Sequence, residues 1–399
     1  MQRTSLPAGH PGEVFRAFLL LGLTAFGGPV AHLGYFRTEF VARRHWLGEK
    51  DYADLVALCQ FLPGPASSQV GFALGLMRAG PLGALAAWTA FTLPSALLMV
   101  LFALGASLLD GPVGAGLVQG LKLAAVAVVA HAVWGMAKNL CPDPTRAGIA
   151  LAGVFTVVLT GGPAGQIAAI TIGALAGTLL CRVRAEPEVQ SLPLPITAST
   201  GHLAGALFAV LLVGLPLLVW IAPSPVLSAV DAFYRAGALV FGGGHVVLPL
   251  LEAEVVQSGW IDANAFLTGY GAAQAVPGPL FTLAAYLGAV MAPVDSVLLG
   301  ATLALLMIFL PGMLLLVAVL PYWNRFRHWQ SARALMRGAN AAVVGILGAA
   351  LYHPVWTGAV QGSLEFALAL AGFLLLSVWK LPAWAVVLLL AGAGLLIAL

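Results

Sequence analysis

The chain has 399 residues, of which 18 are Lys or Arg and 15 are Asp or Glu. This charged fraction of 8% compares with about 25% in a typical soluble domain, while 61% of the residues are hydrophobic. A soluble fold of this size cannot cover its surface with so few charges. The composition therefore excludes a soluble enzyme, a nucleic-acid-binding protein and a disordered chain. It predicts an all-α polytopic membrane protein whose partner is the lipid bilayer.

Apolar segments follow one another along almost the whole chain. A helix needs about 20 apolar residues to cross a hydrocarbon core of about 30 Å. The thirteen candidate segments are, in chain order, 13–31, 51–78, 81–109, 113–137, 147–163, 164–182, 203–221, 226–247, 263–292, 294–320, 333–353, 361–379 and 381–399. Residues 183–202 differ from them, because they combine Arg184, Glu186 and Glu188 with several Pro, Ser and Thr residues. We interpret this stretch as a polar linker.

The sequence contains an internal repeat. Its matched positions lie at an offset that changes only from 214 to 218 residues over about 110 residues. They are Phe26-Gly27-Gly28 with Phe241-Gly242-Gly243, Glu39 with Glu254, Trp46 with Trp260, Gln60 with Gln274, Pro63-Gly64-Pro65 with Pro277-Gly278-Pro279, Leu93-Pro94 with Leu310-Pro311, and Gly120 with Gly338. Several identities at one offset indicate two homologous halves.

The duplication divides the chain into an N-terminal transporter repeat (1–182), the linker (183–202), an extra inverting span (203–221) and a C-terminal transporter repeat (222–399). If each Pro-Gly-Pro segment crosses the membrane once, the first half has six spans and the extra span turns the second half upside down. About 13 membrane segments arranged as an inverted repeat are typical of secondary transporters. If each Pro-Gly-Pro segment re-enters instead of crossing, the parity changes and the halves are parallel.

The two Pro-Gly-Pro motifs are the most informative feature inside the apolar segments. Two prolines around a glycine cannot continue an α-helix, because each Pro lacks an N–H group and clashes with the preceding turn. We therefore predict half-helices over 51–62 and 66–78, and over 263–276 and 280–292. The second half-helix of each pair begins with free N–H groups and a positive dipole end, which favour an anion. The alternative is a purely structural kink.

Other residues extend this predicted anion site. Glycines of the Phe-Gly-Gly segments permit an unwound backbone, although close helix packing is an equal alternative. Lys122 lies deep in its segment and is either a counter-charge or a lysine that snorkels or pairs with an acid. His32, His131, His245 and His353 are candidate proton carriers or packed residues. The predicted substrate-binding residues are Gly27, Gly28, Gln60, Pro63, Gly64, Pro65, Ser67, Ser68, Lys122, Gly242, Gly243, Gly244, His245, Gln274, Pro277, Gly278, Pro279, Thr282 and Asn340.

Motifs for covalent or metal chemistry are missing from the sequence. Cys59, Cys141 and Cys181 are odd in number and lack CxxC spacing, which argues against a metal site. GxxxxGK[ST], HExxH and GxSxG patterns do not occur. A membrane enzyme acting on a lipid phosphate would need paired acids or a His/Arg cluster, and none is apparent. We expect no catalytic residue, no metal and no cofactor.

The ordered combination of these motifs, with Pro29 and His32 after the first Phe-Gly-Gly, resembles the chromate ion transporter (CHR) family in its long, two-domain form. The resemblance covers nearly all of the chain outside 183–202. It implies secondary active efflux of chromate, a tetrahedral oxyanion, across the bacterial inner membrane, and hence chromate resistance. Sulfate is the isosteric competitor, and another anion in the same fold is the alternative. The second half has Gly244-His245 where the first has Pro29-Val30, and the sequence predicts no oligomeric state.

Overall fold

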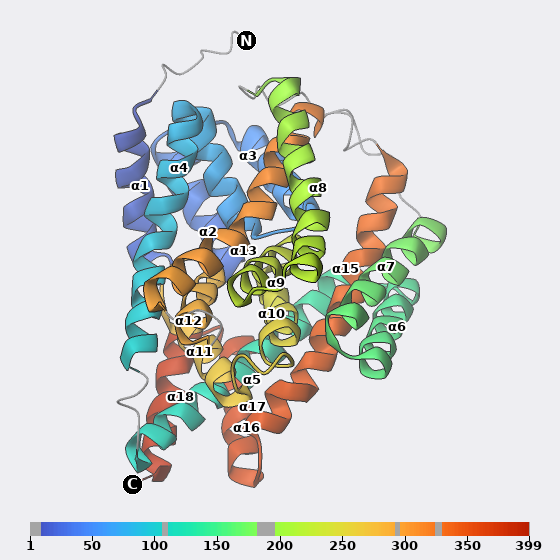
Figure 1. Cartoon of the computed structure of the whole chain (residues 1–399). Helices are drawn as coiled ribbons and strands as arrows, with labels where there is room; N and C mark the ends of the chain where they lie inside the picture. The colour runs from blue at the N-terminus through green and yellow to red at the C-terminus, as the bar shows by residue number, and fades with distance from the viewer. Residues whose placement is uncertain (1–8, 106–110, 182–195, 292–295, 324–328, 399) are drawn as a thin grey trace.

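The computed structural model describes residues 9–105, 111–181, 196–291, 296–323 and 329–398. Every regular element in these ranges is a helix (Figure 1), as expected for an all-α membrane protein. Six helices of the described chain are long and apolar enough to cross a membrane. They are Ala66–Gly105, Pro112–Leu140, Gly162–Leu180, Ala198–Ile221, Val297–Tyr322 and Gln330–Ala359.

The first half contains seven α-helices and one π-helical segment within the described residues. They are α1 (Pro11–Thr24), α2 (Gly28–Phe36), η1 (Arg37–Arg43), α3 (Glu49–Phe61), α4 (Ala66–Gly105), α5 (Pro112–Leu140), α6 (Pro144–Thr160) and α7 (Gly162–Leu180). A non-helical backbone at Ala79 and Gly80 kinks α4, because Gly80 has a φ of +64°. Residues 66–78 therefore form a separate half-helix. Gly161 separates α6 from α7, close to the boundary between the predicted segments 147–163 and 164–182.

The second half follows α8 (Ala198–Ile221), the helix that corresponds to the predicted extra span. Its elements are α9 (Pro225–Ala238), η3 (Gly244–Val246), α10 (Val247–Val255), α11 (Ala263–Ala275), η4 (Leu280–Thr282), α12 (Leu283–Val290), α13 (Val297–Val319), η5 (Leu320–Tyr322), α15 (Gln330–Ala350), η6 (Leu351–Trp356), α16 (Thr357–Ala359), α17 (Ser363–Ser377) and α18 (Ala383–Ala398). Residues 198–202 of the predicted linker are helical, and 182–195 lie outside the described residues.

Corresponding helices pack in the same way inside the two halves. Gly22 of α1 lies against the α4 backbone, where an added Cβ would be 3.0 Å from the Phe91 carbonyl oxygen. Gly237 of α9 lies against α13, and a Cβ there would be 3.0 Å from Cγ of Pro311. Small residues at such contacts let membrane helices approach closely without a hydrophobic driving force. The shared packing agrees with a duplicated half.

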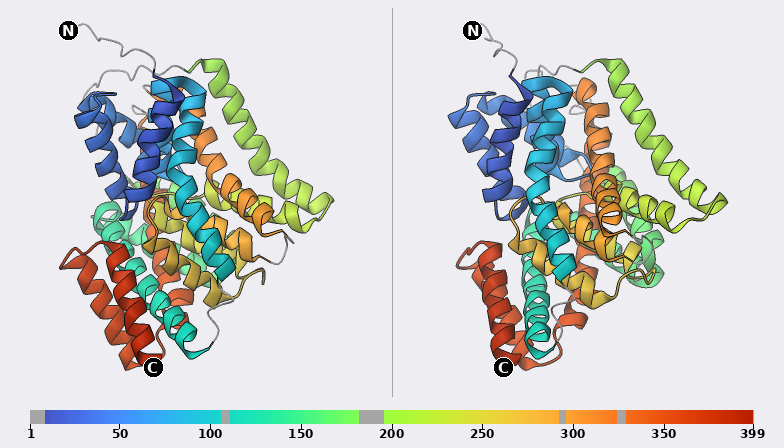
Figure 2. Two further views of the ribbon diagram at one scale, coloured as in Figure 1. Left: turned by 90° about the vertical axis from the view of Figure 1, so that its left-hand side faces the viewer. Right: turned by 60° about the vertical axis from the view of Figure 1, so that its left-hand side comes forward.

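The last hairpin of each half packs on the other half. In Figures 1 and 2 the α17–α18 pair lies beside α5, and the α6–α7 pair lies beside α15. Gly120 of α5 faces α18, where an added Cβ would be 2.6 Å from Cα of Ala391. Gly338 of α15 faces α7, where a Cβ would be 2.7 Å from the Gly177 nitrogen. The two halves are therefore interlocked, since each contributes helices to the other's packing.

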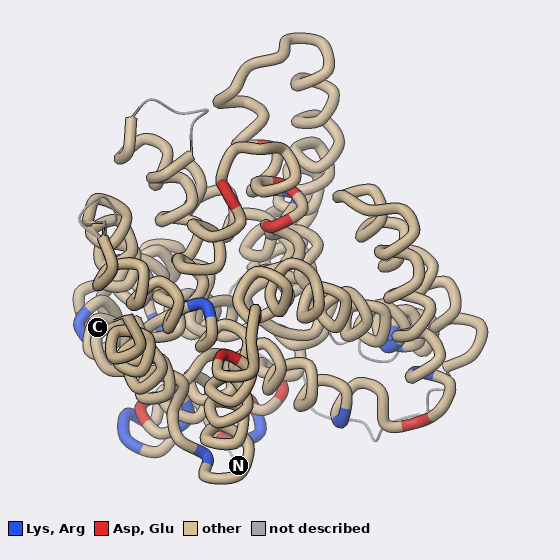
Figure 3. The backbone as a smooth tube through the Cα atoms, turned by 90° about the horizontal axis from the view of Figure 1, so that it is seen from below, with Lys and Arg blue, Asp and Glu red and all other residues tan. Residues whose placement is uncertain are grey.

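Charged residues are sparse along the chain (Figure 3), and several of them form ion pairs where helices begin or end. Arg37 pairs with Glu49 at 2.8 Å, and Arg78 pairs with Glu13 at 3.0 Å. Asp143 caps α6 by accepting the backbone N–H of Arg146, and this bond and the Arg146 side chain lower the pKa of Asp143. Apolar side chains instead cover the exposed face of α8, as expected for a surface in contact with lipid.

Candidate transport site

Both Pro-Gly-Pro motifs break their helices, as predicted. The first break separates α3 from α4, with Gly64 at a φ of +119°. The second separates α11 from η4 and α12, with Gly278 at a φ of +96°. These left-handed values require glycine at both positions. The half-helices end and begin within two residues of the sequence prediction.

Each break is bound to the Phe-Gly-Gly segment of the other half. The Gly64 N–H donates to the carbonyl of Val240 at 2.7 Å, and Val240 directly precedes Phe241. The Gly278 N–H donates to the carbonyl of Ala25 at 2.9 Å, and Ala25 directly precedes Phe26. We call the contact of residues 63–65 with Val240 the first crossing. The contact of residues 277–279 with Ala25 is the second crossing.

The two Phe-Gly-Gly segments also meet each other. Pro29 and Gly244 occupy corresponding positions, and a Cβ added to Gly244 would lie 3.2 Å from Cγ of Pro29. A residue that contacts its own counterpart lies close to a two-fold axis, as in a self-complementary dimer interface. The exchanged bonds of the two crossings fit the same two-fold relation. The structure thus brings four motifs, distant in sequence, to one central region.

A glutamine side chain stabilises the first crossing. Gln69 Nε2 donates to the carbonyls of Pro63 at 3.0 Å and Gly312 at 2.9 Å. Gly312 follows Leu310-Pro311, and a Cβ added to Gly64 would lie 2.9 Å from the Gly312 Cα. Within the described chain, Ser68 Oγ beside this site is buried without a hydrogen-bond partner. Its hydroxyl is available to a ligand.

An imidazole and hydroxyl groups lie at the second crossing. His32 is fully buried, with Nε2 3.2 Å from the Ala25 carbonyl and Nδ1 3.4 Å from Ser67 Oγ. The Ala25 oxygen therefore contacts both the Gly278 N–H and His32. Thr282 Oγ1 donates to the Pro279 carbonyl at 2.9 Å, so this hydroxyl closes its own turn. Ser95 Oγ would lie 2.8 Å from a Cβ on Gly278.

Further predicted residues lie around the second-half Phe-Gly-Gly. His245 Nδ1 is 3.0 Å from the Tyr270 hydroxyl. Asn340 Oδ1 lies 3.6 Å from the position of a Cβ on Gly242. In the part of the chain that the structure describes, this Asn340 oxygen and Gln274 Nε2 are buried and lack partners. Unpaired buried polar atoms are rare in folded proteins, and they indicate a site for a ligand or water.

Two predicted residues differ from the others: Lys122 lies apart from the crossings, and Gln60 lies three residues before the first break. Lys122 is 6% exposed, and its Nζ donates to Asn264 Oδ1 at 2.9 Å. Asn264 stands at the start of α11, so twelve helical residues, about 18 Å, separate it from the break after Ala275. The hydrogen-bond partner of Lys122 is thus an amide and not the acid that the sequence analysis considered, and a role as counter-charge stays a prediction. Gln60 is exposed, unlike its counterpart Gln274.

The sequence analysis missed three residues at the crossings: Gln69, Ser95 and Gly312. Gln69 was one residue beyond the two serines that the prediction selected. Ser95 and Gly312 directly follow the matched Leu-Pro pairs, so their positions in the repeat were a usable signal. What the sequence could not indicate is that each of them contacts a motif of the other half.

The arrangement is suited to an anion. The half-helix 66–78 begins at the first crossing, where its first N–H groups and dipole favour negative charge. Ser68 and Gln274 add buried donors without partners in the described structure. Such groups can replace the hydration of an oxyanion without a buried cation.

Comparison with known proteins assigns the chain to a family. A sequence model of the family described as Chromate transporter matches residues 12–178 and 227–396. The chain belongs to the chromate transporter family. Members are transporters, so this chromate transporter family member is a multi-pass membrane transporter and not an enzyme. The two matched segments correspond to two halves.

Several named relatives span most of this transporter. It is 28% identical over 349 residues to the probable chromate transport protein of Synechococcus elongatus, covering 86% of this chain and 84% of that protein. The chromate transport protein of Cupriavidus metallidurans is 28% identical over 347 residues, which cover 84% and 80%. An uncharacterized transporter of Methanocaldococcus jannaschii is 26% identical over 343 residues, which cover 84% and 82%. No solved structure matches the transporter.

Proposed function

We propose that this transporter exports chromate by a secondary active mechanism and so confers chromate resistance. Its relative in Cupriavidus metallidurans bears the name chromate transport protein, and its relative in Synechococcus elongatus the name probable chromate transport protein. Export of a dianion from a negative-inside cell is electrically favourable, because each charge gains about 2.3 kcal/mol per 100 mV. The membrane potential can therefore drive efflux without ATP.

The single observation that supports this function best is the pair of crossings. Broken helices that meet unwound backbone of the opposite half form the substrate sites of many secondary transporters. Here the crossings lie beside buried donors without partners in the described chain, on Ser68 and Gln274. A tetrahedral oxyanion needs such donors once it has lost its water.

We further propose that the halves form an inverted repeat with about 13 membrane segments in the bacterial inner membrane. In Figure 1, α5 and α15, which contain the corresponding Gly120 and Gly338, run in opposite directions. The exchanged bonds of the crossings support a two-fold relation between the halves. If the axis lies in the membrane plane, the second half is upside down. A labelling experiment on single cysteines introduced at Gly161 and Gly362 would test the sidedness of this topology.

Transport in proteoliposomes tests the substrate. Labelled chromate should enter vesicles under an inside-positive potential, and sulfate should compete if the site selects tetrahedral dianions. Pro63→Ala or Pro277→Ala should slow this uptake at least about tenfold while folded yield is retained, because the breaks position the donors. Pro216→Ala, inside α8, is the matched control and should leave transport unchanged.

Either of two results would contradict the proposal. If the vesicles transport sulfate or another anion but not chromate, the proposed substrate is wrong, while the proposed site is not contradicted. Normal transport by both break variants would remove the crossings from the mechanism.

A further inference from the structure

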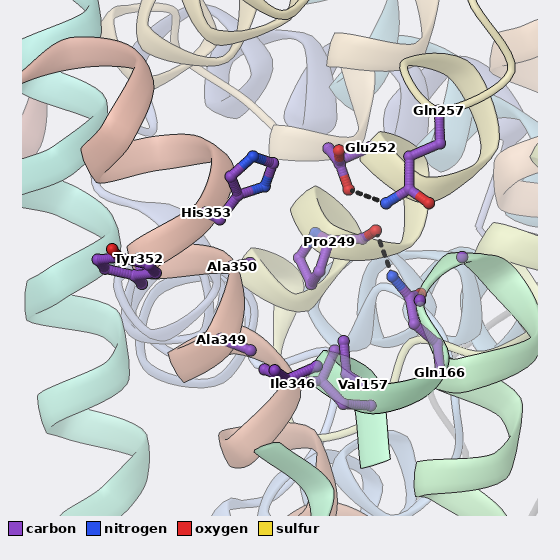
Figure 4. Close-up of a pocket in the computed structure, with 13 residues that line it drawn as sticks. Val157, Gln166, Pro249, Glu252, Gln257, Ile346, Ala349, Ala350, Tyr352 and His353 are labelled. Carbon is purple, nitrogen blue, oxygen red and sulfur yellow. Dashed lines mark hydrogen bonds between the residues drawn. The ribbon is translucent and has the colours of Figure 1, made fainter. Parts of the chain in front are cut away.

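A cavity of about 310 Å³ lies away from the crossings, between helices of the two halves. Its walls come from the α6–α7 turn, α10, and the end of α15 with η6 (Figure 4). Val158, Tyr352 and His353 are exposed at its rim, whereas Gln166, Pro249 and Glu252 are buried. The cavity therefore leads from the protein surface to a buried carboxylate.

Two acidic residues of α10 are paired differently. Glu254 forms an ion pair with Arg235 at 2.8 Å. Glu252 is 6% exposed and accepts one hydrogen bond, from Gln257 Nε2 at 3.1 Å. Within the described residues, no Lys or Arg side chain pairs with Glu252, and the His353 ring faces it without a hydrogen bond. A buried carboxylate whose one hydrogen-bond donor is a neutral amide is costly, and a cation would offset this cost.

The surroundings of Glu252 indicate the kind of cation. The cavity has the volume of a small organic ligand, much larger than a bare metal ion needs. Val157, Ile346 and Ala349 provide apolar walls, and the residues that line it include no Lys or Arg. Gln166 Nε2 is occupied by the Pro249 carbonyl at 2.6 Å, which leaves its amide oxygen as an acceptor. Acceptors beside an apolar wall suit a primary ammonium group on a short carbon chain.

We propose that this cavity binds a primary ammonium group, with Glu252 as its counter-charge. The ammonium belongs to a free small amine or to the headgroup of an aminophospholipid. The site is specific to the second half, because the position that corresponds to Glu252 in the first half is Arg37, which pairs with Glu49. Binding here is separate from anion transport, so it does not depend on chromate being the substrate.

Protonation should oppose this binding. The titratable groups at the cavity are Glu252 on α10 and Tyr352 and His353 on η6, and Figure 4 shows the Glu252 and His353 side chains extending toward the same space. A protonated Glu252 loses its charge and with it the attraction for an ammonium ion. Amine binding should therefore be weaker near about pH 5 than near about pH 8.

The test uses the purified full chain in detergent that contains no aminophospholipid. Ethanolamine should raise the thermal unfolding midpoint in a saturable way, whereas ethylene glycol, which lacks the ammonium, should not. Glu252→Gln should weaken ethanolamine binding more than about tenfold, because it removes the charge and keeps the shape. Glu365→Gln, on α17, is the matched control and should bind normally. Ala349→Phe, which fills the cavity but retains Glu252, should also abolish binding.

A second arm distinguishes the source of the ammonium. The chain is compared in nanodiscs of phosphatidylethanolamine and of phosphatidylcholine, whose quaternary nitrogen cannot donate. If phosphatidylethanolamine stabilises the chain but not Glu252→Gln, and ethanolamine has no effect, the ammonium group belongs to a lipid headgroup. A response to ethanolamine that Glu252→Gln removes assigns a free amine. The proposal is overturned if neither ethanolamine nor phosphatidylethanolamine stabilises the chain, or if binding survives both Glu252→Gln and Ala349→Phe. It is also overturned if infrared spectra show that Glu252 is protonated at neutral pH.

Discussion

The two crossings have the same backbone bond but different side chains around it. At the first crossing an amide, Gln69, binds two carbonyls, and the Gly64 backbone touches the Gly312 backbone. At the second crossing the Gly278 N–H shares its acceptor with the His32 imidazole, and a hydroxyl lies beside the glycine. The duplication has thus kept the backbone geometry, while the two sites have acquired different chemistry.

This difference indicates which crossing is the more rigid. Contacts between two backbones cannot be relieved by a change of rotamer, whereas a serine or imidazole can rotate. We therefore expect the first crossing to hold the halves together and the second crossing to rearrange during transport. Three comparisons between variants separate the crossings on this basis.

The largest difference is expected from alanine at the two crossing glycines. Gly64→Ala adds a Cβ at 2.9 Å from the Gly312 Cα, on a backbone with positive φ. It should lower the free energy of unfolding by about 3 kcal/mol or more. Gly278→Ala also has positive φ, but its Cβ meets Ser95 Oγ at 2.8 Å and a backbone atom, the Phe91 oxygen, only at 3.2 Å, so it should lower the free energy of unfolding by less, because the Ser95 side chain can move. Thermal unfolding in detergent measures both. Adding Ser95→Gly should recover part of the Gly278→Ala loss, and equal losses at both glycines would contradict the comparison.

A smaller effect is expected from Gln69→Leu. The corresponding residue of the second half is Leu283, so the variant copies that half. The change leaves the buried carbonyls of Pro63 and Gly312 without their donor and should cost about 2 kcal/mol. Gln119→Leu removes one bond, to the Ala359 carbonyl, and should cost about 1 kcal/mol. Unfolding midpoints compare the two variants. A Gln69→Leu loss no larger than that of Gln119→Leu would remove Gln69 from the first crossing.

The smallest stability effect is expected from His32→Val, which copies Val247, the second-half counterpart. Loss of the bond to the Ala25 carbonyl and of the long contact with Ser67 Oγ should lower the free energy of unfolding by about 1 kcal/mol, similar to Gln119→Leu. If the second crossing moves during transport, His32→Val should nevertheless slow chromate uptake by a larger factor than Gln119→Leu. His32→Gln keeps a donor and should restore part of the rate. Identical uptake by His32→Val and Gln119→Leu would indicate a purely structural histidine.

The sequence predicted local features of the site better than its contacts. Both helix breaks follow from proline chemistry, and the structure places them where they were predicted. The sequence also selected Lys122 as a candidate residue, because burying a cation in a membrane segment is costly. Its actual partner, Asn264, is 142 residues away and has no motif of its own. Residues that bind across such separations leave no local pattern.

The sequence by itself determined the class of protein, the all-helical fold, the duplication and the two helix breaks. These properties depend on composition, on the spacing of apolar residues and on what single residues permit in a backbone. Only the tertiary structure decided that each break binds the opposite half, and that Glu252 faces a cavity while Glu254 pairs with Arg235. The physical reason is that hydrogen bonds and ion pairs depend on which helix faces come together, and in a duplicated chain either half offers a partner for the same motif.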